Sequence, residues 1–276
     1  MAPQKWIITG CSSGFGRAIA LKALQQGHKV ALTARDLNTI QEIAEEFPDQ
    51  AACYELDVTD SGRIRFVVAE ANKRFGGIDV LVNNAGYGLL AALEETTEVQ
   101  MRKVFETIVY GSVEMTRAVL PIFREQKSGR VINMSAKAGY DNYPGFAAYG
   151  GAKYALEGIS EALAKEVAPF NVKVTLVEPG PFRTQFIGKS MQHGALPNEA
   201  YKATVGKFGT ILKSIDGKQK GDPEKAAELI LKIAQDENPP LRLPLGAYAL
   251  NAWRQKMKLM EAEFSKWEAD SKATDF

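Results

Sequence analysis

The first part of the chain passes from an apolar strand through a glycine-rich turn into an amphipathic helix. Residues 6–8 are apolar throughout, which is typical of a central parallel strand covered on both faces. Apolar residues then recur over 18–24 and give that segment one apolar face. The connecting turn reads Gly10-Cys11-Ser12-Ser13-Gly14-Phe15-Gly16. This order predicts a phosphate-binding turn, because free N–H groups and the helix dipole favour an anion there.

The same alternation of strand and helix continues along the chain. Further strands are predicted over 28–34, 51–56, 79–82, 130–133, 172–177 and 241–243, and helices over 61–75, 97–126 and 149–167 and from Pro223 onward. The pattern predicts an α/β fold, a doubly wound parallel sheet (Rossmann) of about seven strands with helices on both faces. The cofactor is expected across the carboxyl ends of the strands, at the switch between the first and fourth strands.

We expect one domain over residues 1–276, since no linker-like stretch interrupts the pattern. Residues 182–222 leave the strand-helix rhythm and are predicted to form a substrate lid. Residues 246–270 form a C-terminal helical extension whose apolar positions favour packing on the core or on a neighbouring subunit. Those positions are Leu250, Trp253, Met257, Met260, Phe264 and Trp267.

Composition narrows the classes of partner. The 34 basic residues balance 33 acidic ones, for a net charge of +1, so no nucleic-acid or anionic-membrane partner is expected. The cysteines Cys11 and Cys53 and the histidines His28 and His193 show no paired ligand spacing, so no metal is expected. The first strand begins near residue 5 and no apolar run approaches about 18 residues, so we expect a cytoplasmic protein.

The end of the second predicted strand bears on the choice of cofactor. An acidic residue there would bond the adenosine ribose 2′-OH. This chain has Thr33-Ala34-Arg35, a small residue followed by a guanidinium that can grip a 2′-phosphate with paired donors. The pattern favours NADP(H) over NAD(H), with Ser12 and Ser13 as additional donors. The alternative is a solvated arginine at a strand end.

Five motifs occur in a fixed order along residues 5–185: Thr9-Gly10-x-x-x-Gly14-x-Gly16, Asp57, Asn83-Asn84-Ala85-Gly86, Tyr149-x-x-x-Lys153 and Pro179-Gly180-x-x-x-Thr184. Together they resemble the short-chain dehydrogenase/reductase family. The later segment Leu241-Arg242-Leu243-Pro244-Leu245-Gly246 and the closing residues 271–276 also look like an NADPH-preferring branch of that family.

The resemblance assigns roles to the cofactor-binding positions. It implies that Asp57 bonds the adenine amino group with Val58 under the ring, and that Thr184 bonds the nicotinamide amide or the diphosphate. Asn83, Ala85 and Gly86 would line the adenosine ribose, although Asn83-Asn84 is also ordinary turn chemistry. The full expected set is Gly10, Ser12, Ser13, Gly14, Phe15, Gly16, Arg35, Asp57, Val58, Asn83, Ala85, Gly86, Tyr149, Lys153, Pro179, Gly180 and Thr184.

Tyr149 and Lys153 are the expected catalytic residues. They stand four apart on a predicted helix and so share one face. A cation near the phenol is expected to lower the pKa of Tyr149 and make it a general acid or base. The resemblance implies that Lys153 also orients the nicotinamide ribose, and that the chain forms a homodimer or homotetramer.

Two positions depart from the family pattern. The family places an asparagine where this chain has Ile108, and a serine where it has Ala136. Isoleucine has no donor or acceptor with which to hold a water near the catalytic lysine, and alanine cannot bond a substrate oxygen. Ser135 is adjacent but is not expected to substitute, because neighbouring residues leaving a strand point in different directions. We therefore expect reduced or altered activity.

The expected function is NADP(H)-dependent oxidoreduction, with hydride moving between NADPH and a carbonyl/alcohol or imine of a mid-sized, largely apolar small-molecule substrate. Two alternatives stay open: a repurposed family member that reduces an iminium or promotes a cyclisation, and a non-catalytic or engineered inactive NADP(H)-binding protein. Candidate pocket residues are Tyr87, Leu89, Tyr143, Phe146, Phe182, Phe186, Ile187, Met191, Leu196 and Tyr201.

Overall fold

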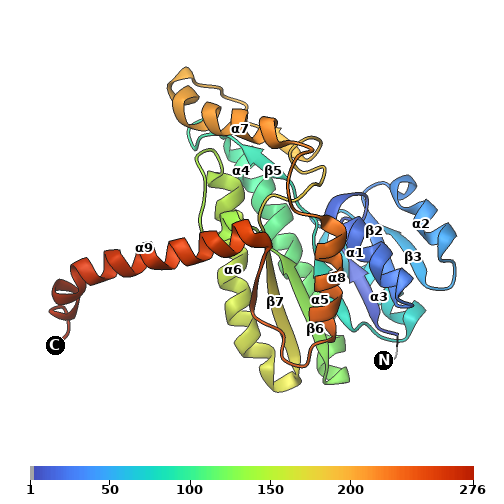
Figure 1. Cartoon of the computed structure of the whole chain (residues 1–276). Coiled ribbons are helices and arrows are strands. Elements are labelled where there is room, and N and C mark those ends of the chain that lie inside the picture. Colours follow the sequence, from blue (N-terminus) through green and yellow to red (C-terminus); the bar gives the residue numbers. More distant parts are fainter. Residues whose placement is uncertain (1–2) are drawn as a thin grey trace.

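A seven-stranded parallel sheet forms the centre of the computed structural model, which describes residues 3–276 (Figure 1). Its order is β3-β2-β1-β4-β6-β7-β9, so the direction of winding reverses between β1 and β4. The predicted doubly wound fold is confirmed. The strands are β1 (Lys5–Ile8), β2 (Lys29–Ala34), β3 (Ala51–Glu55), β4 (Val80–Asn83), β6 (Gly129–Met134), β7 (Val172–Pro179) and β9 (Arg242–Leu245).

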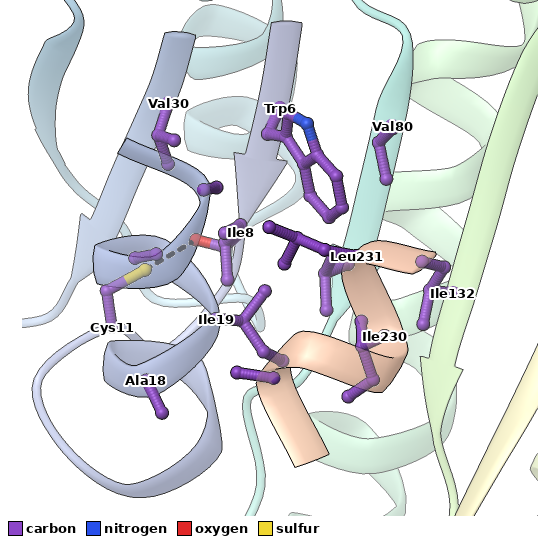
Figure 2. Packing of buried hydrophobic residues seen from close by; sticks show 14 of the residues in the cluster. Trp6, Ile8, Cys11, Ala18, Ile19, Val30, Val80, Ile132, Ile230 and Leu231 are labelled. Atoms are coloured by element: carbon purple, nitrogen blue, oxygen red, sulfur yellow. Dashed lines mark hydrogen bonds between the residues drawn. The ribbon is translucent and has the colours of Figure 1, made fainter. Parts of the chain in front are cut away.

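Helices cover both faces of the sheet, which explains why the first strand is apolar at successive positions. Trp6 and Ile8 point to the face covered by α1 (Gly14–Gln25) and α8 (Pro223–Gln235), where Ile19, Ile230 and Leu231 meet them (Figure 2). Ile7 points to the opposite face, against α3 (Ser61–Phe75), α5 (Gly111–Gln126) and α6 (Ala147–Val167). Because successive strand residues alternate between faces, a strand covered on both must be apolar at each position.

The helical segment predicted over 97–126 contains an irregular turn. Helix α4 spans Glu98–Phe105 and is capped by Thr97, whose hydroxyl accepts a hydrogen bond from the backbone amide of Gln100 at 3.2 Å. A π-helical turn over Glu106–Tyr110 joins it to α5. Turns of this type often occur at functional sites, and this one carries Ile108.

The segment predicted as a lid has more regular structure than its sequence pattern indicated. A second, two-stranded parallel sheet pairs β5 (Gly88–Leu90) with β8 (Met191–His193). Helix α7 (Lys207–Ile215) follows in the same segment, and both lie beyond the carboxyl ends of the main strands (Figure 1). Strands of three residues are too short to give a recognisable alternation.

Short elements complete the chain. Helix α2 spans Gln41–Glu46, and 3₁₀ turns span Leu37–Thr39, Lys137–Gly139, Ala168–Phe170 and Glu199–Tyr201, the last followed by a π-helical turn over Lys202–Gly206. Helix α9 (Gly246–Lys272) ends the fold and projects away from the body (Figure 1). Among residues 3–276, no helix has both the length and the apolar character needed to cross a bilayer.

Candidate active site

The glycine turn between β1 and α1 has the backbone shape that its glycines permit. Gly10 and Gly14 have φ of 73° and 57°, a left-handed region that side chains disfavour. A Cβ on Gly16 would lie 2.2 Å from the Gly10 carbonyl oxygen, so only glycine lets α1 begin this close to the turn. The first amides of α1 are therefore available at the sheet's carboxyl edge to bind an anion.

Thr9 and Asn84 join this turn to the end of β4. The Thr9 hydroxyl accepts hydrogen bonds from the backbone amides of Asn84 and Ala85, each at 2.9 Å. In return, Asn84 Nδ2 donates to the carbonyls of Thr9 and Gly10 at 2.8 and 3.1 Å. The contact holds the two strands on either side of the topological switch in fixed register. Sequence reasoning assigned no such bracing contact to Thr9, although its position at the strand end was visible.

A cleft of about 1400 Å³ runs along the carboxyl ends of the strands. Most of the residues expected at the site line it, although they come from segments far apart in the chain. These are Gly10, Ser12, Ser13, Gly14, Phe15, Arg35, Asp57, Val58, Ala85, Gly86, Ala136, Tyr149, Lys153, Pro179, Gly180 and Thr184.

Asn83 differs from its expected place beside the adenosine ribose, because its side chain points into the protein. It is 4% exposed, and its Nδ2 donates to Asn133 Oδ1 at 2.8 Å and to Thr116 Oγ1 at 3.1 Å. It therefore ties β4 to β6 and α5. Since β4 alternates its side chains between faces, Asn83 and Asn84 take opposite directions, and Asn84 reaches the cleft.

At the other end of the cleft, Arg35 and Asp57 follow the neighbouring strands β2 and β3. Both are exposed. Asp57 Oδ1 accepts hydrogen bonds from the Thr59 amide at 2.9 Å and from the Thr59 hydroxyl at 2.8 Å, which fixes the carboxylate. Val58 is buried beside Gly111, where an added Cβ would lie 2.8 Å from Val58 Cγ2.

Tyr149 and Lys153 lie in the first turns of α6 and face the cleft. Lys153 Nζ donates to the Met134 carbonyl at 2.5 Å and lies 5.8 Å from the centre of the Tyr149 ring. Both side chains are buried, at 7% and 5% exposure. The geometry brings a phenol and an ammonium to one wall, as their spacing predicted.

Burial dominates the protonation of both groups. It raises the pKa of Tyr149 above that of an exposed tyrosine. It also lowers the pKa of Lys153 to about 8, an effect that the nearby Glu157 carboxylate partly opposes. The expectation that the ammonium lowers the pKa of Tyr149 is not met, because burial of the phenol raises its pKa instead. Tyr149 carries its proton at neutral pH.

The two unusual positions lie beside this pair. Ala136 lines the cleft and packs in the same apolar cluster as Tyr149. Ser135 does not replace the missing hydroxyl: its Oγ is fully buried and makes no hydrogen bond of normal geometry within residues 3–276. That oxygen faces Gly139, where an added Cβ would lie 2.7 Å from it. Ile108 is 1% exposed and packs behind Gly86, so it offers no polar group.

Aromatic side chains enclose the region around Tyr149. Phe146 and Phe186 lie 5.2 and 5.3 Å from its ring, while Tyr143 stacks on Phe208 at 4.8 Å. Tyr87, Phe182 and Ile187 also line the cleft as expected, whereas Leu89, Met191, Leu196 and Tyr201 do not. Sequence reasoning missed Phe208, Ile211, Leu212 and Ile215 of α7, and also Tyr248.

Lys137 is a second lysine of the cleft that sequence reasoning did not single out. It is 7% exposed, forms an ion pair with Asp141, and lies over the Tyr143 ring at 3.9 Å. Its charge is thus satisfied within the wall that it helps to form.

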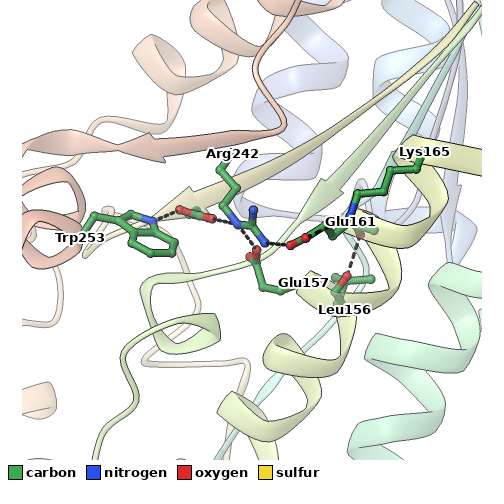
Figure 3. Close-up of polar contacts among 8 residues, drawn as sticks. Leu156, Glu157, Glu161, Lys165, Arg242 and Trp253 are labelled. Carbon is green, nitrogen blue, oxygen red and sulfur yellow. Dashed lines mark hydrogen bonds and ion pairs between the residues drawn. The ribbon is translucent and has the colours of Figure 1, made fainter. Parts of the chain in front are cut away.

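A network of polar side chains connects α6, which carries Tyr149 and Lys153, with β7, β9 and α9 (Figure 3). Arg242 of β9 donates to Glu157 at 3.1 Å and to Glu161 at 2.8 Å, both on α6. Trp253 of α9 donates to Glu178 of β7, whose pKa burial raises to about 8. The network fixes α6, and with it Tyr149 and Lys153, against the sheet.

The chain is similar to known oxidoreductases over its full length. It is 38% identical to the oxidoreductase BOA17 of Botryotinia fuckeliana, over 98% of both chains. It is also 38% identical to a 3-ketodihydrosphingosine reductase of Bacteroides thetaiotaomicron, over 89% of both. The crystal structure of a short-chain dehydrogenase from Streptomyces avermitilis superposes with a TM-score of 0.94, at 44% identity over all of both chains.

Solved neighbours hold either nicotinamide dinucleotide. ElxO has NADP bound and matches at 26% identity and a TM-score of 0.75, over 90% of this chain and 99% of its own. A Burkholderia phymatum family member holds NAD; at 23% identity it shows the shared fold alone, with a TM-score of 0.83 over 95% of both chains.

The short chain dehydrogenase family model matches residues 4–194. This range includes the glycine turn, Asn84 with its hydrogen bonds to that turn, and the Tyr149–Lys153 pair. The motifs that resemble this family in the sequence thus meet at one cleft of the fold. The chain belongs to the short-chain dehydrogenase/reductase family of oxidoreductases.

Proposed function

We propose that the protein is an NADPH-dependent reductase of ketones on mid-sized, largely apolar substrates. The observation that carries the proposal is the Tyr149 phenol, which lines an aromatic cleft with Lys153 Nζ 5.8 Å from its ring centre. Burial raises the pKa of this phenol, so at neutral pH it carries the proton that reduction of a carbonyl consumes. We therefore propose reduction as the direction of the reaction.

The residues of the turn fit a dinucleotide diphosphate. Positive φ at Gly10 and Gly14 and the absence of a side chain at Gly16 leave the α1 amides accessible. Arg35 follows β2 without a carboxylate partner within 4.0 Å among residues 3–276, so its guanidinium is available to a 2′-phosphate. This favours NADPH. When bound, the cofactor supplies the hydride.

Each catalytic residue has a distinct role in the proposal. Tyr149 gives its phenolic proton to the substrate oxygen as the carbonyl carbon accepts hydride, which yields the alcohol. Lys153, held by the Met134 carbonyl, orients the nicotinamide ribose and then supports the tyrosinate by its charge. Ala136 gives no second hydrogen bond to the oxygen, so the reaction should be slower than with serine.

The substrate class follows from the walls of the cleft. Phe146 and Phe186 lie against the Tyr149 ring, Phe208 of α7 packs on Phe146 at 5.2 Å, and the same helix adds further apolar residues. Aromatic and aliphatic walls favour a substrate with a substantial apolar body next to its carbonyl group. The relative from Bacteroides thetaiotaomicron, a 3-ketodihydrosphingosine reductase, agrees with this proposal.

A second candidate is reduction of an iminium, favoured by the methyl group at Ala136 and the inward-facing Ser135 hydroxyl. An iminium carbon already carries the positive charge that attracts hydride and forms no oxyanion. The absence of a hydroxyl at Ala136 would then not lower the rate of reduction.

Stopped-flow oxidation of NADPH tests both candidates. The enzyme is mixed with ketones and cyclic imines matched in size, and cofactor absorbance is followed in single turnovers. Faster oxidation with ketones, lost in Tyr149→Phe, is the expected result. Oxidation with imines alone would select the second candidate, and oxidation with neither class would leave a non-catalytic NADP(H)-binding protein.

A further inference from the structure

The outer half of α9 carries large apolar side chains that no part of residues 3–276 covers. Met257, Phe264 and Trp267 are 62%, 60% and 58% exposed, and Met260 is 37% exposed. They follow one another in steps of three, four and three, which places them on one side of the helix. At 27 residues, α9 is about 40 Å long, and this half stands clear of the body (Figure 1).

The root of the same helix is firmly held. Trp253 stacks on Tyr140 with ring centres 4.0 Å apart. Its indole also donates to Glu178 (Figure 3). The Tyr140 hydroxyl donates to the Ala249 carbonyl at 2.8 Å. From Trp253 to Trp267 the helix rises about 21 Å. Because the helix is continuous, its apolar side lies away from the body of the same chain and is open to a partner.

Charge is divided along the outer half of α9. Arg254, Lys256 and Lys258 lie towards the root, whereas Glu261, Glu263, Glu268 and Asp270 lie towards the tip. Two lysines interrupt the acidic part, Lys266 and Lys272, and Lys272 pairs with Glu268 at 2.6 Å within the helix. A helix that is basic at one end and acidic at the other complements a second copy of itself that runs in the opposite direction.

We propose that two copies of the chain pair through α9 as antiparallel helices. Met260 then packs on the partner's Phe264, and Met257 on the partner's Trp267, each contact occurring twice by symmetry. On the two flanks, Arg254 faces the partner's Glu268 and Lys256 faces the partner's Asp270.

The antiparallel arrangement is favoured over a parallel one by these flanking charges. In the antiparallel pair, like charges meet only on the two-fold axis, where Glu261 and Glu263 each face their own copies. In a parallel pair, Lys256 would face the partner's Glu261, which is favourable. However, Glu263 would face the partner's Glu268 in both symmetry-related positions, and Arg254 would face no acidic residue of the partner helix.

Sedimentation velocity of the full chain over a range of concentrations tests the pairing. Phe264→Glu places a charge in the middle of the contact between the two α9 helices and should raise the dimer dissociation constant at least about tenfold. Leu259→Glu is the matched control, because Leu259 is 55% exposed on the same helix but lies outside the row formed by Met257, Met260, Phe264 and Trp267. This variant should change the dimer dissociation constant less than about threefold. Unchanged NADPH binding shows that both variants are folded.

Three results would overturn the proposal: a monomer at about 100 µM, an equal loss of dimer in Leu259→Glu, or a dimer that Phe264→Glu leaves intact. Charge reversal tests the direction of the pairing. Arg254→Glu and Glu268→Lys should each weaken the dimer, and the double variant should recover it. If neither single variant has an effect, or the double variant is no tighter than the singles, the antiparallel pairing is wrong.

Discussion

Replacing Ala136 by serine tests whether the cleft is a ketone reductase site that lacks one hydrogen-bond donor. Ala136 is 9% exposed, lines the cleft and shares an apolar cluster with Tyr149. A serine there would add one hydroxyl to the wall of the cleft, in the same cluster as the phenol that we propose as the proton donor. The neighbouring Ser135 cannot give this hydrogen bond, since its hydroxyl is fully buried on the Gly139 side.

The size of the effect follows from the chemistry of the substrate oxygen. In the proposed reaction, charge develops on this oxygen as hydride reaches the carbon, and Tyr149 is the proposed donor to it. One preorganised donor to a developing oxyanion is worth about 2.7–4 kcal/mol, or about 10²–10³ in rate. Ala136→Ser should therefore raise kcat for a ketone about 100-fold or more. Ser135→Ala is the matched control and should leave kcat within about threefold, because it removes a hydroxyl that does not reach the cleft.

Steady-state NADPH oxidation with one ketone, measured on the parent and the two variants, gives the comparison. Tyr149→Phe in the Ala136→Ser background should abolish the gain, because phenylalanine has no proton to give. A crystal structure of the serine variant would establish that its hydroxyl lies within hydrogen-bond reach of Tyr149. If the hydroxyl is in reach and ketone turnover is still unchanged, the reasoning from a missing donor is refuted. A gain on ketones paired with a loss on imines would instead identify the alanine as part of iminium chemistry.

Cofactor choice, the glycine turn and the charge of Lys153 each give a further expected outcome. Arg35→Ala should reduce the preference for NADPH over NADH about 10- to 100-fold in fluorescence titrations. Equal affinities of the parent protein for NADPH and NADH would contradict the assignment of NADPH as the cofactor. Gly16→Ala should destabilise the fold by about 1–3 kcal/mol in urea, because its Cβ would meet the Gly10 carbonyl at 2.2 Å, whereas Gly158→Ala on α6 meets nothing within 4 Å and should be neutral or stabilising. Burial lowers the pKa of Lys153 from 10.5 to about 8, so between these pH values the unfolded chain binds more protons than the folded chain. The free energy of unfolding should therefore rise with pH across that window in the parent protein relative to Lys153→Met. The same pH dependence of unfolding free energy in both proteins would contradict this expectation.

The sequence was most informative where a local pattern determines the geometry. The apolar strand at residues 6–8 and the turn from Gly10 to Gly16 predicted both the fold and the cleft, because a strand buried on two faces and a turn next to a helix each demand particular residues. The Tyr149–Lys153 spacing likewise predicted a shared wall, since helical geometry alone brings these two side chains together.

The parts that the sequence did not predict depend on contacts between distant segments. The inward direction of Asn83 depends on Asn133 and Thr116, which belong to other elements. The raised pKa of Tyr149 depends on how deeply three-dimensional packing buries the ring, and spacing along a helix carries no information about depth. Helix α7 within the predicted lid contributes Phe208 to the cleft, but one short helix in an irregular stretch gives too few periods to identify.

Isotope transfer tests the central claim most directly. NADPH carrying deuterium at the transferable C4 position is incubated with the enzyme and a ketone that has an apolar body, and the alcohol is examined by mass spectrometry and NMR. The account predicts one deuterium on the carbinol carbon, with transfer lost in Tyr149→Phe while NADPH still binds. Alcohol without deuterium, or transfer that persists unchanged in Tyr149→Phe, would contradict it.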